Sequence, residues 1–147
     1  MYQYAEQLLD LIEQGPSRYH ATANLKNRLT AEGYTALAED AAWDVRPGGR
    51  YVVTRNDSSL LAFRVPEGGV TGFALAAAHS DSPTFQIKEH AEKLSARCTV
   101  LDTEKYGGML MNTWFDRPLS VAGRIIVERD GKLEARLADV DRDLMII

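Results

Sequence analysis

The spacing of apolar residues at the start of the chain is that of amphipathic helices, in which such residues recur every three or four positions. The first set consists of Ala5, Leu8, Leu9 and Ile12. It predicts a helix over residues 4–14. A second set with this spacing lies within residues 19–32 and is followed by Gly33, a residue typical of the position just after a helix end. The chain is therefore expected to open with two packed helices.

Beyond Trp43 the pattern changes to short β-branched and aromatic runs separated by turn residues. Residues 51–54 and 60–63 lie on either side of Asn56-Asp57-Ser58, which predicts a β-hairpin. Residues 72–78 are apolar without alternation, as expected of a strand that is buried on both faces at the centre of a sheet.

Shorter apolar runs with turns between them predict mostly β-structure in the second half of the chain. They span residues 85–88, 98–101, 119–127 and 133–137. Asp130-Gly131, between the last two runs, is a hairpin signal. The change of character falls near residue 90, so we expect an α/β region over residues 1–90 and a β-rich region over residues 91–147.

Composition narrows the class of protein. Of the 147 residues, 45% are hydrophobic and 26% are charged, which favours an ordinary soluble domain over a disordered or coiled-coil chain. The net charge of −4, without a local concentration of Lys and Arg, argues against a nucleic-acid partner. No apolar run reaches the ~20 residues of a membrane span, so no membrane partner is expected. Cys98 is the only cysteine, which excludes an internal disulfide and favours a reducing, cytoplasmic location.

The segment with the most chemical content runs from His79 to Pro83, where the predicted central strand gives way to a loop. In extended backbone, residues two apart point the same way, so His79 and Asp81 can share one side. A histidine ring nitrogen can bind Zn²⁺, and a nearby carboxylate can orient the ligand or a catalytic group. Because short His/Asp pairs are common, a structural histidine that is hydrogen-bonded at a strand end is the alternative interpretation.

A second cluster combines Tyr106-Gly107-Gly108 with Trp114-Phe115-Asp116-Arg117. A tight turn and a packed aromatic corner are favoured there over an interface anchor or a buried ion pair. His20 is expected to cap or pack the second helix, and His90 lies in a solvated stretch. Cys98 is expected to be a small, buried hydrophobic residue within a strand.

Six short segments, taken together, indicate a protein family more specifically than any one of them does. They are Gly49-Arg50-Tyr51, Thr54-Arg55-Asn56-Asp57-Ser58-Ser59, Ala78-His79-Ser80-Asp81-Ser82-Pro83, Tyr106-Gly107-Gly108, Trp114-Phe115-Asp116-Arg117 and Gly131-Lys132-Leu133-Glu134. In this order and approximate spacing the chain resembles the N-terminal portion of the aspartyl aminopeptidase family. The resemblance covers nearly the whole chain and favours the metal-site interpretation of His79.

This resemblance implies a cytosolic zinc metallo-aminopeptidase that removes N-terminal Asp or Glu residues from peptide substrates with two metal ions. Such ions polarise the scissile carbonyl and lower the pKa of a bridging water. By the resemblance, His79 would be a metal ligand, and Asp81 would be the catalytic carboxylate that orients the metal-site histidine.

The resemblance also implies an α/β fold class. Residues 1–90 would be part of a mixed-sheet metallopeptidase catalytic domain. Residues 91–147 would begin an inserted β-rich dimerisation domain, through which a homo-oligomer forms.

The general-base Glu and the remaining metal ligands of that family lie downstream of the residues present here, so the 147-residue chain alone is expected to be inactive. The alternative is a non-catalytic protein-binding or assembly module in which Trp114-Phe115 contacts a partner and His79 is structural. Metal content separates the two hypotheses, because only the enzyme would hold zinc.

Overall fold

A computed structural model describes residues 2–140 and 145–146 of the chain. By contacts within the chain, residues 2–81 and 121–140 form one compact unit, and residues 82–120 with 145–146 form a second. The division therefore falls after Asp81, and a later segment returns to the first unit. The domain boundary expected at residue 90 concerns the complete protein and stays a prediction.

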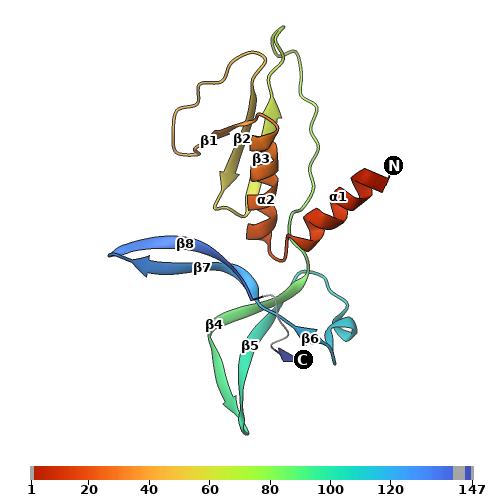
Figure 1. The fold of residues 1–147 in the computed structure, drawn as a ribbon, viewed down its shortest axis with the longest axis vertical. Coiled ribbons are helices and arrows are strands. Elements are labelled where there is room, and N and C mark those ends of the chain that lie inside the picture. The colour runs from red at the N-terminus through yellow and green to blue at the C-terminus, as the bar shows by residue number, and fades with distance from the viewer. Residues whose placement is uncertain (1, 141–144, 147) are drawn as a thin grey trace. The chain divides into compact units, whose positions relative to one another are not determined.

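Two helices open the first unit, as predicted: α1 (Tyr2–Glu13) and α2 (Arg18–Ala31) (Figure 1). Ser17 caps α2 by accepting a hydrogen bond from the backbone N–H of His20, and its Oγ lies 2.8 Å from His20 Nδ1. Ser17 is therefore the capping residue, and His20, expected to cap or pack this helix, is the partner of that cap. The helices contact each other, and Arg28 donates a hydrogen bond to Gln7 at 2.8 Å, but α1 has no buried residue.

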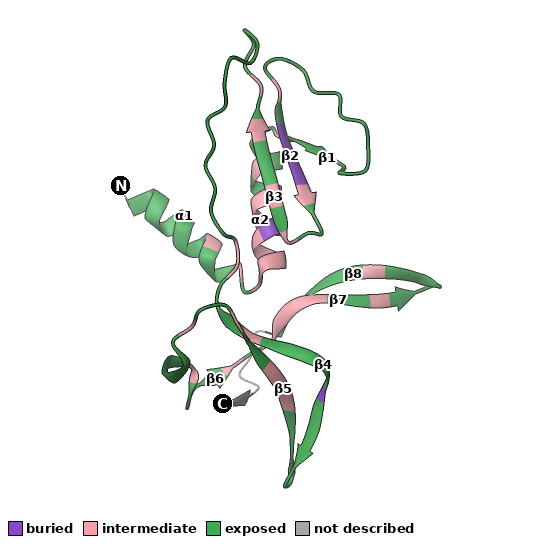
Figure 2. Cartoon of the chain, turned by 180° about the vertical axis from the view of Figure 1, so that it is seen from behind, coloured by how far each residue is buried: buried purple, intermediate pink, exposed green. Residues whose placement is uncertain are grey.

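A three-stranded sheet packs against α2. Its middle strand is β2 (Arg50–Arg55), which pairs in parallel with β1 (Thr35–Leu37) and antiparallel with β3 (Ser59–Arg64). The predicted hairpin is therefore confirmed, while β1 was not anticipated. The core lies on β2, where Val52 is fully buried, and Thr22 of α2 is 1% exposed (Figure 2).

Aromatic residues extend this core. Phe63 of β3 stacks on Tyr51 at a ring-centroid distance of 5.3 Å and on Trp43 at 6.2 Å. The Tyr51 hydroxyl accepts a hydrogen bond from the backbone N–H of Arg46 at 2.9 Å. The long loop between β1 and β2 is thus attached to the sheet.

The central buried strand predicted for residues 72–78 is not formed. The segment pairs with no strand among the described residues, and Phe73 and Leu75 are 87% and 89% exposed. Figure 1 shows it as a long coil between β3 and β4. The prediction was wrong because a central strand needs a hydrogen-bonded strand along each edge and other elements packed on both faces. The described residues provide neither for this segment.

The predicted hairpin at Asp130-Gly131 is confirmed and belongs to the first unit. It joins β7 (Ala122–Arg129) to β8 (Lys132–Asp139), and Arg129 pairs with Lys132 across the turn. β7 also contacts α2, so the hairpin packs against this helix.

The second unit is built on the antiparallel pair β4 (Thr84–Ser95) and β5 (Cys98–Tyr106). A short 3₁₀ helix, η1 (Met111–Trp114), follows, and β6 (Pro118–Leu119) pairs with β9 (Met145–Ile146). The mostly β character expected of this part of the chain is confirmed.

A bulge between Ile87 and Glu92 interrupts the β4–β5 ladder, and His90 within it has a φ of 55°. Phe85 meets Trp114 edge-on at 5.4 Å, which forms the packed aromatic corner that was favoured. Cys98, expected to be buried, is exposed. It begins β5 beside the hairpin turn, where β4 is its one neighbouring strand among the described residues.

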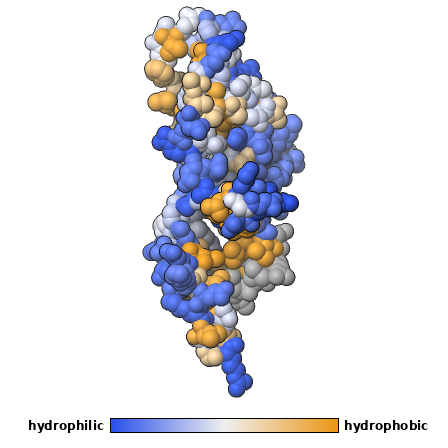
Figure 3. Space-filling model, turned by 90° about the vertical axis from the view of Figure 1, so that its left-hand side faces the viewer, coloured by the Kyte–Doolittle hydropathy of each residue, from blue (hydrophilic) through white to orange (hydrophobic). Residues whose placement is uncertain are grey.

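Apolar surface is common along the described residues, as the orange patches on the face drawn in Figure 3 show. On the β7–β8 hairpin, for example, Ile126 and Leu133 are 59% and 76% exposed. Within the part of the chain that the structure describes, no helix is long and apolar enough to cross a membrane.

Candidate metal-binding segment

His79 and Asp81 follow residues 72–78 in a segment without regular secondary structure and interact as their spacing predicts. His79 Nδ1 is 2.8 Å from the backbone carbonyl oxygen of Asp81 and 3.2 Å from its carboxylate Oδ1. The His79 side chain is 80% exposed and that of Asp81 33%. The two-residue spacing therefore places imidazole and carboxylate together on one side of the chain.

The two oxygens beside Nδ1 fix the tautomer of the neutral His79 ring. A carbonyl oxygen and a carboxylate oxygen can only accept hydrogen bonds, so Nδ1 must carry the proton that is shared with them. Nε2 then keeps its lone pair. This is the orientation that metal-binding histidines adopt when a carboxylate or carbonyl holds the opposite ring nitrogen.

The donor set fits zinc in kind, because imidazole nitrogen is one of the ligands that Zn²⁺ prefers. It is incomplete in number. Among residues 2–140 and 145–146, no group of three or more His, Cys, Asp or Glu side chains could hold a metal ion. Because a zinc site needs three or four ligands, the described residues provide one candidate ligand and the group that orients it.

Other candidates from the sequence do not gather around His79. His20 donates to the Ser17 cap at the start of α2, and His90 is in the bulge of β4 in the other unit. Asp116 is exposed with a φ of 54°, and Arg117 donates to the backbone carbonyl of Thr113 at 3.3 Å. No ion pair between Asp116 and Arg117 forms among the described contacts, so the turn interpretation of that cluster holds.

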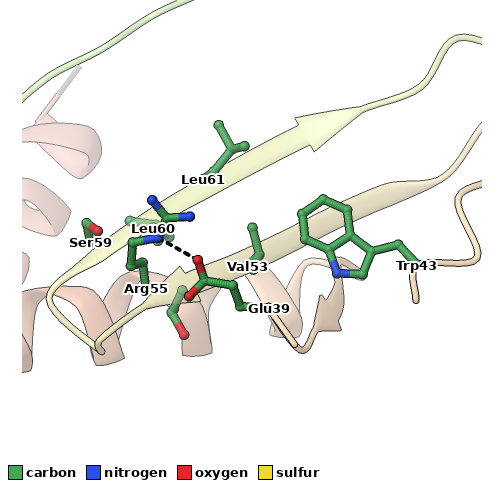
Figure 4. Close-up of a pocket in the computed structure, with 8 residues that line it drawn as sticks. Glu39, Trp43, Val53, Arg55, Ser59, Leu60 and Leu61 are labelled. Atoms are coloured by element: carbon green, nitrogen blue, oxygen red, sulfur yellow. Dashed lines mark hydrogen bonds and ion pairs between the residues drawn. The ribbon is translucent and has the colours of Figure 1, made fainter. Parts of the chain in front are cut away.

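A shallow hollow of about 430 Å³ lies on the sheet of the first unit and is separate from the His79 segment. Glu39, Trp43, Arg55 and Leu61 are among the residues that line it, and Figure 4 shows Glu39 paired with Arg55. The distance between Glu39 Oε1 and Arg55 Nε is 2.5 Å. Its charged groups already neutralise each other, and neither His79 nor Asp81 lines it. We therefore do not assign the chemistry to this hollow.

Two contacts beside the metal-binding segment were not anticipated from the sequence. Ser80 Oγ donates to the carbonyl oxygen of Ser58 at 3.5 Å. Arg124 of β7 donates to the neighbouring Asn56, at 2.8 Å to its carbonyl oxygen and 3.0 Å to Oδ1. Asn56 and Arg124 are 68 positions apart, so no local pattern could have revealed their contact.

The first unit is thus an α/β arrangement, a mixed sheet packed against α2, and it carries a candidate zinc-binding histidine whose Nδ1 is held by Asp81. Residues 11–147 match the model of the aminopeptidase I zinc metalloprotease family, M18. The chain belongs to this family. The resemblance drawn from the sequence is confirmed at the level of M18.

Relatives and solved structures agree with this assignment. A probable M18 family aminopeptidase 2 from Clostridium acetobutylicum is 41% identical over 99% of this chain and 35% of its own length. The structure of Chaetomium thermophilum mApe1 is 34% identical with a TM-score of 0.87, over 96% of this chain and 33% of that one. The S. cerevisiae mApe1 dodecamer is 25% identical with a TM-score of 0.81, over 94% and 33%.

The matched region is a part of each of these proteins. The chain spans about a third of the length of the curated relatives that it matches. The mixed α/β fold class is that of the solved M18 aminopeptidases, and the family is a zinc metalloprotease family.

Proposed function

We propose that this chain contributes part of the zinc site of a metallo-aminopeptidase that removes N-terminal Asp or Glu residues from peptides by two-metal-assisted hydrolysis. The observation that carries the proposal is the His79–Asp81 pair, in which the carboxylate holds one ring nitrogen and leaves the other for a metal. Membership of a zinc metalloprotease family supports zinc as the ion. The acidic preference rests on the aspartyl aminopeptidase resemblance alone.

His79 would hold zinc through Nε2. Zinc held there would supply Lewis acidity for the scissile carbonyl and for the attacking water. Asp81 would keep the ring in the correct tautomer and orientation, and its negative charge would strengthen the donor power of the imidazole. Because the side chain of His79 is 80% exposed, a metal ion bound to it would be accessible to further ligands from other residues.

The other ligands and the general base would come from outside the described residues, so the 147-residue chain alone would not hydrolyse peptides. Activity would belong to a larger polypeptide or assembly. A dodecamer among the related structures supports a homo-oligomer, which we attribute to the β-rich region over residues 91–147. We also propose a cytoplasmic location, because a single cysteine suits a reducing compartment.

The first measurement is the intact mass of the protein in its source cells, compared with 16.3 kDa. A mass about three times larger would mean a longer polypeptide that can contain the missing ligands. Zinc content and hydrolysis of Asp-peptides would then be measured on that protein. A mass of 16.3 kDa would remove the claim of activity and leave the family assignment.

The matched variants are His79→Ala and His90→Ala, because both histidines are exposed and only His79 is in the proposed site. In the complete enzyme, His79→Ala should lose bound zinc and hydrolysis together, while His90→Ala keeps both. Retention of zinc and activity by His79→Ala would refute the metal-ligand role and favour a structural His79 in a binding module. Equal cleavage of Asp-, Leu- and Lys-peptides would refute the acidic preference.

A further inference from the structure

Ser80 lies between the two proposed site residues and attaches their segment to the rest of the first unit. Its hydroxyl contacts Ser58, whereas the side chain of His79 is 80% exposed. Ser80 is half-buried, and the contact is a hydrogen bond from its hydroxyl to the carbonyl oxygen of Ser58. This contact limits rotation of the segment about its own axis, and such rotation would redirect both site residues.

Ser58 belongs to the turn between β2 and β3, and this turn has an uncommon backbone. Its residues Asn56 and Asp57 have φ values of 50° and 53°, and the Ser58 N–H donates to the Arg55 carbonyl at 3.1 Å. Left-handed backbone is tolerated by Asn and Asp but is kept in place by its surroundings. The position of the Ser58 carbonyl therefore depends on what holds the turn.

Arg124 holds the turn from the other side. One of its guanidinium nitrogens, Nη1, binds both the backbone oxygen and the side-chain oxygen of Asn56. The guanidinium also lies over the ring of Tyr19 in α2, 4.4 Å from its centroid. A single half-buried side chain from β7 thus fixes the turn against α2.

We propose that Arg124 is a positioning residue for the metal-binding segment. By holding Asn56 it fixes the carbonyl of Ser58 that receives Ser80, and so fixes the direction in which His79 and Asp81 point. The purpose of this alignment rests on the proposed function, whereas the alignment itself is independent of metal. Both parts can be measured separately.

The test compares Arg124→Met and Ser80→Ala with Arg129→Met, which removes an exposed arginine from the hairpin end of the same strand. In the metal-free chain, backbone ¹⁵N relaxation reports the order parameters of residues 79–81. We expect values near 0.85 in the wild type and in Arg129→Met, and values below about 0.6 in the other two variants.

The Zn²⁺ affinity of the complete enzyme gives the second measurement, because the described residues provide only one candidate ligand. Arg124→Met and Ser80→Ala should each weaken Zn²⁺ binding at His79 about tenfold, the lower end of the effect of changing groups that orient a ligand. The double variant should lose no more than either single one, because both act through the same turn. A general loss of stability would instead make the two losses add.

The outcomes separate this inference from the proposed function. Unchanged order parameters and Zn²⁺ affinity in Arg124→Met would overturn the positioning role and leave the metal site standing. Loosening of residues 79–81 by Arg124→Met, together with a complete enzyme whose bound zinc is unaffected by His79→Ala, would support the positioning role and contradict the metal-ligand role. Equal loosening in Arg129→Met would overturn the positioning role, because any change on β7 would then suffice.

Discussion

Gly49→Ala is expected to destabilise the first unit because the side chain of Tyr51 folds back over Gly49. A Cβ added there would overlap the Tyr51 hydroxyl and lie 2.5 Å from Cε2 and 2.6 Å from Cζ. Gly49 is not among the residues with positive φ, so the expected cost comes from this contact and not from the backbone conformation. Either the ring of Tyr51 or the strand end must move.

The cost can be worked out from what holds the Tyr51 ring. The residue is 6% exposed, its ring stacks on Phe63, and its hydroxyl accepts a hydrogen bond from Arg46. Displacing the ring loses that hydrogen bond, about 1 kcal/mol, and the ring pair, about 1 kcal/mol. Residual overpacking adds about 1 kcal/mol. Gly49→Ala should therefore lower the free energy of unfolding by about 3 kcal/mol.

Urea unfolding followed by circular dichroism and Trp43 fluorescence measures this change, because Trp43 stacks on Phe63 in the same cluster. Gly68→Ala is the matched control. A Cβ at Gly68 meets nothing within 4 Å, and its change should stay within about 0.5 kcal/mol. In a Tyr51→Val background, Gly49→Ala should cost nothing further. Equal midpoints for Gly49→Ala and Gly68→Ala would refute the reasoning.

Three further predictions concern burial and charge. Thr22→Val should raise the free energy of unfolding by about 1 kcal/mol, because the buried Thr22 hydroxyl has no hydrogen-bond partner among the described residues. A lowered urea midpoint would contradict this. Val52→Ala should lower the free energy of unfolding by about 2 kcal/mol through the lost methyl groups and the cavity, and an unchanged midpoint would show that Val52 is not in the core. The hydrogen bond from Lys93, with help from Lys88, lowers the pKa of Asp102 against a smaller opposing effect of desolvation. The Asp102 carboxylate should therefore stabilise the β4–β5 pair above its unfolded pKa, and this contribution should disappear as the pH falls through the lowered folded pKa. Amide exchange across an acid titration measures it, and Asp102→Asn should remove that pH dependence.

Local signals in the sequence predicted the elements whose formation depends on near neighbours. The apolar residues that predicted the two helices lie within three or four positions of one another, and Asp130-Gly131 closes the β7–β8 hairpin by itself. The apolar run at residues 72–78 was a different case. Its composition indicated a buried strand, and that prediction was wrong, because such a strand needs partners, which composition does not reveal and the described residues do not contain.

In the candidate site, too, the local contact was predicted from the sequence and the long-range contact was not. The interaction between His79 and Asp81 follows from the two-residue repeat of extended backbone and was predicted. The contribution of Arg124 was not, because its contact with Asn56 joins positions 68 apart and arginine on a strand is ordinarily a solvated residue. Family resemblance supplied the metal chemistry that neither residue spacing nor composition could specify.

The unpaired segment at residues 72–78 also has a consequence for biosynthesis. It carries no charged residue, and its Phe73 and Leu75 side chains are almost fully exposed. While the chain emerges from the ribosome at about 5–20 residues per second, such a stretch stays available to other nascent chains. Soluble yield should therefore rise with holdase chaperones and with lower expression temperature, and a charged residue in place of Leu75 should have the same effect on yield.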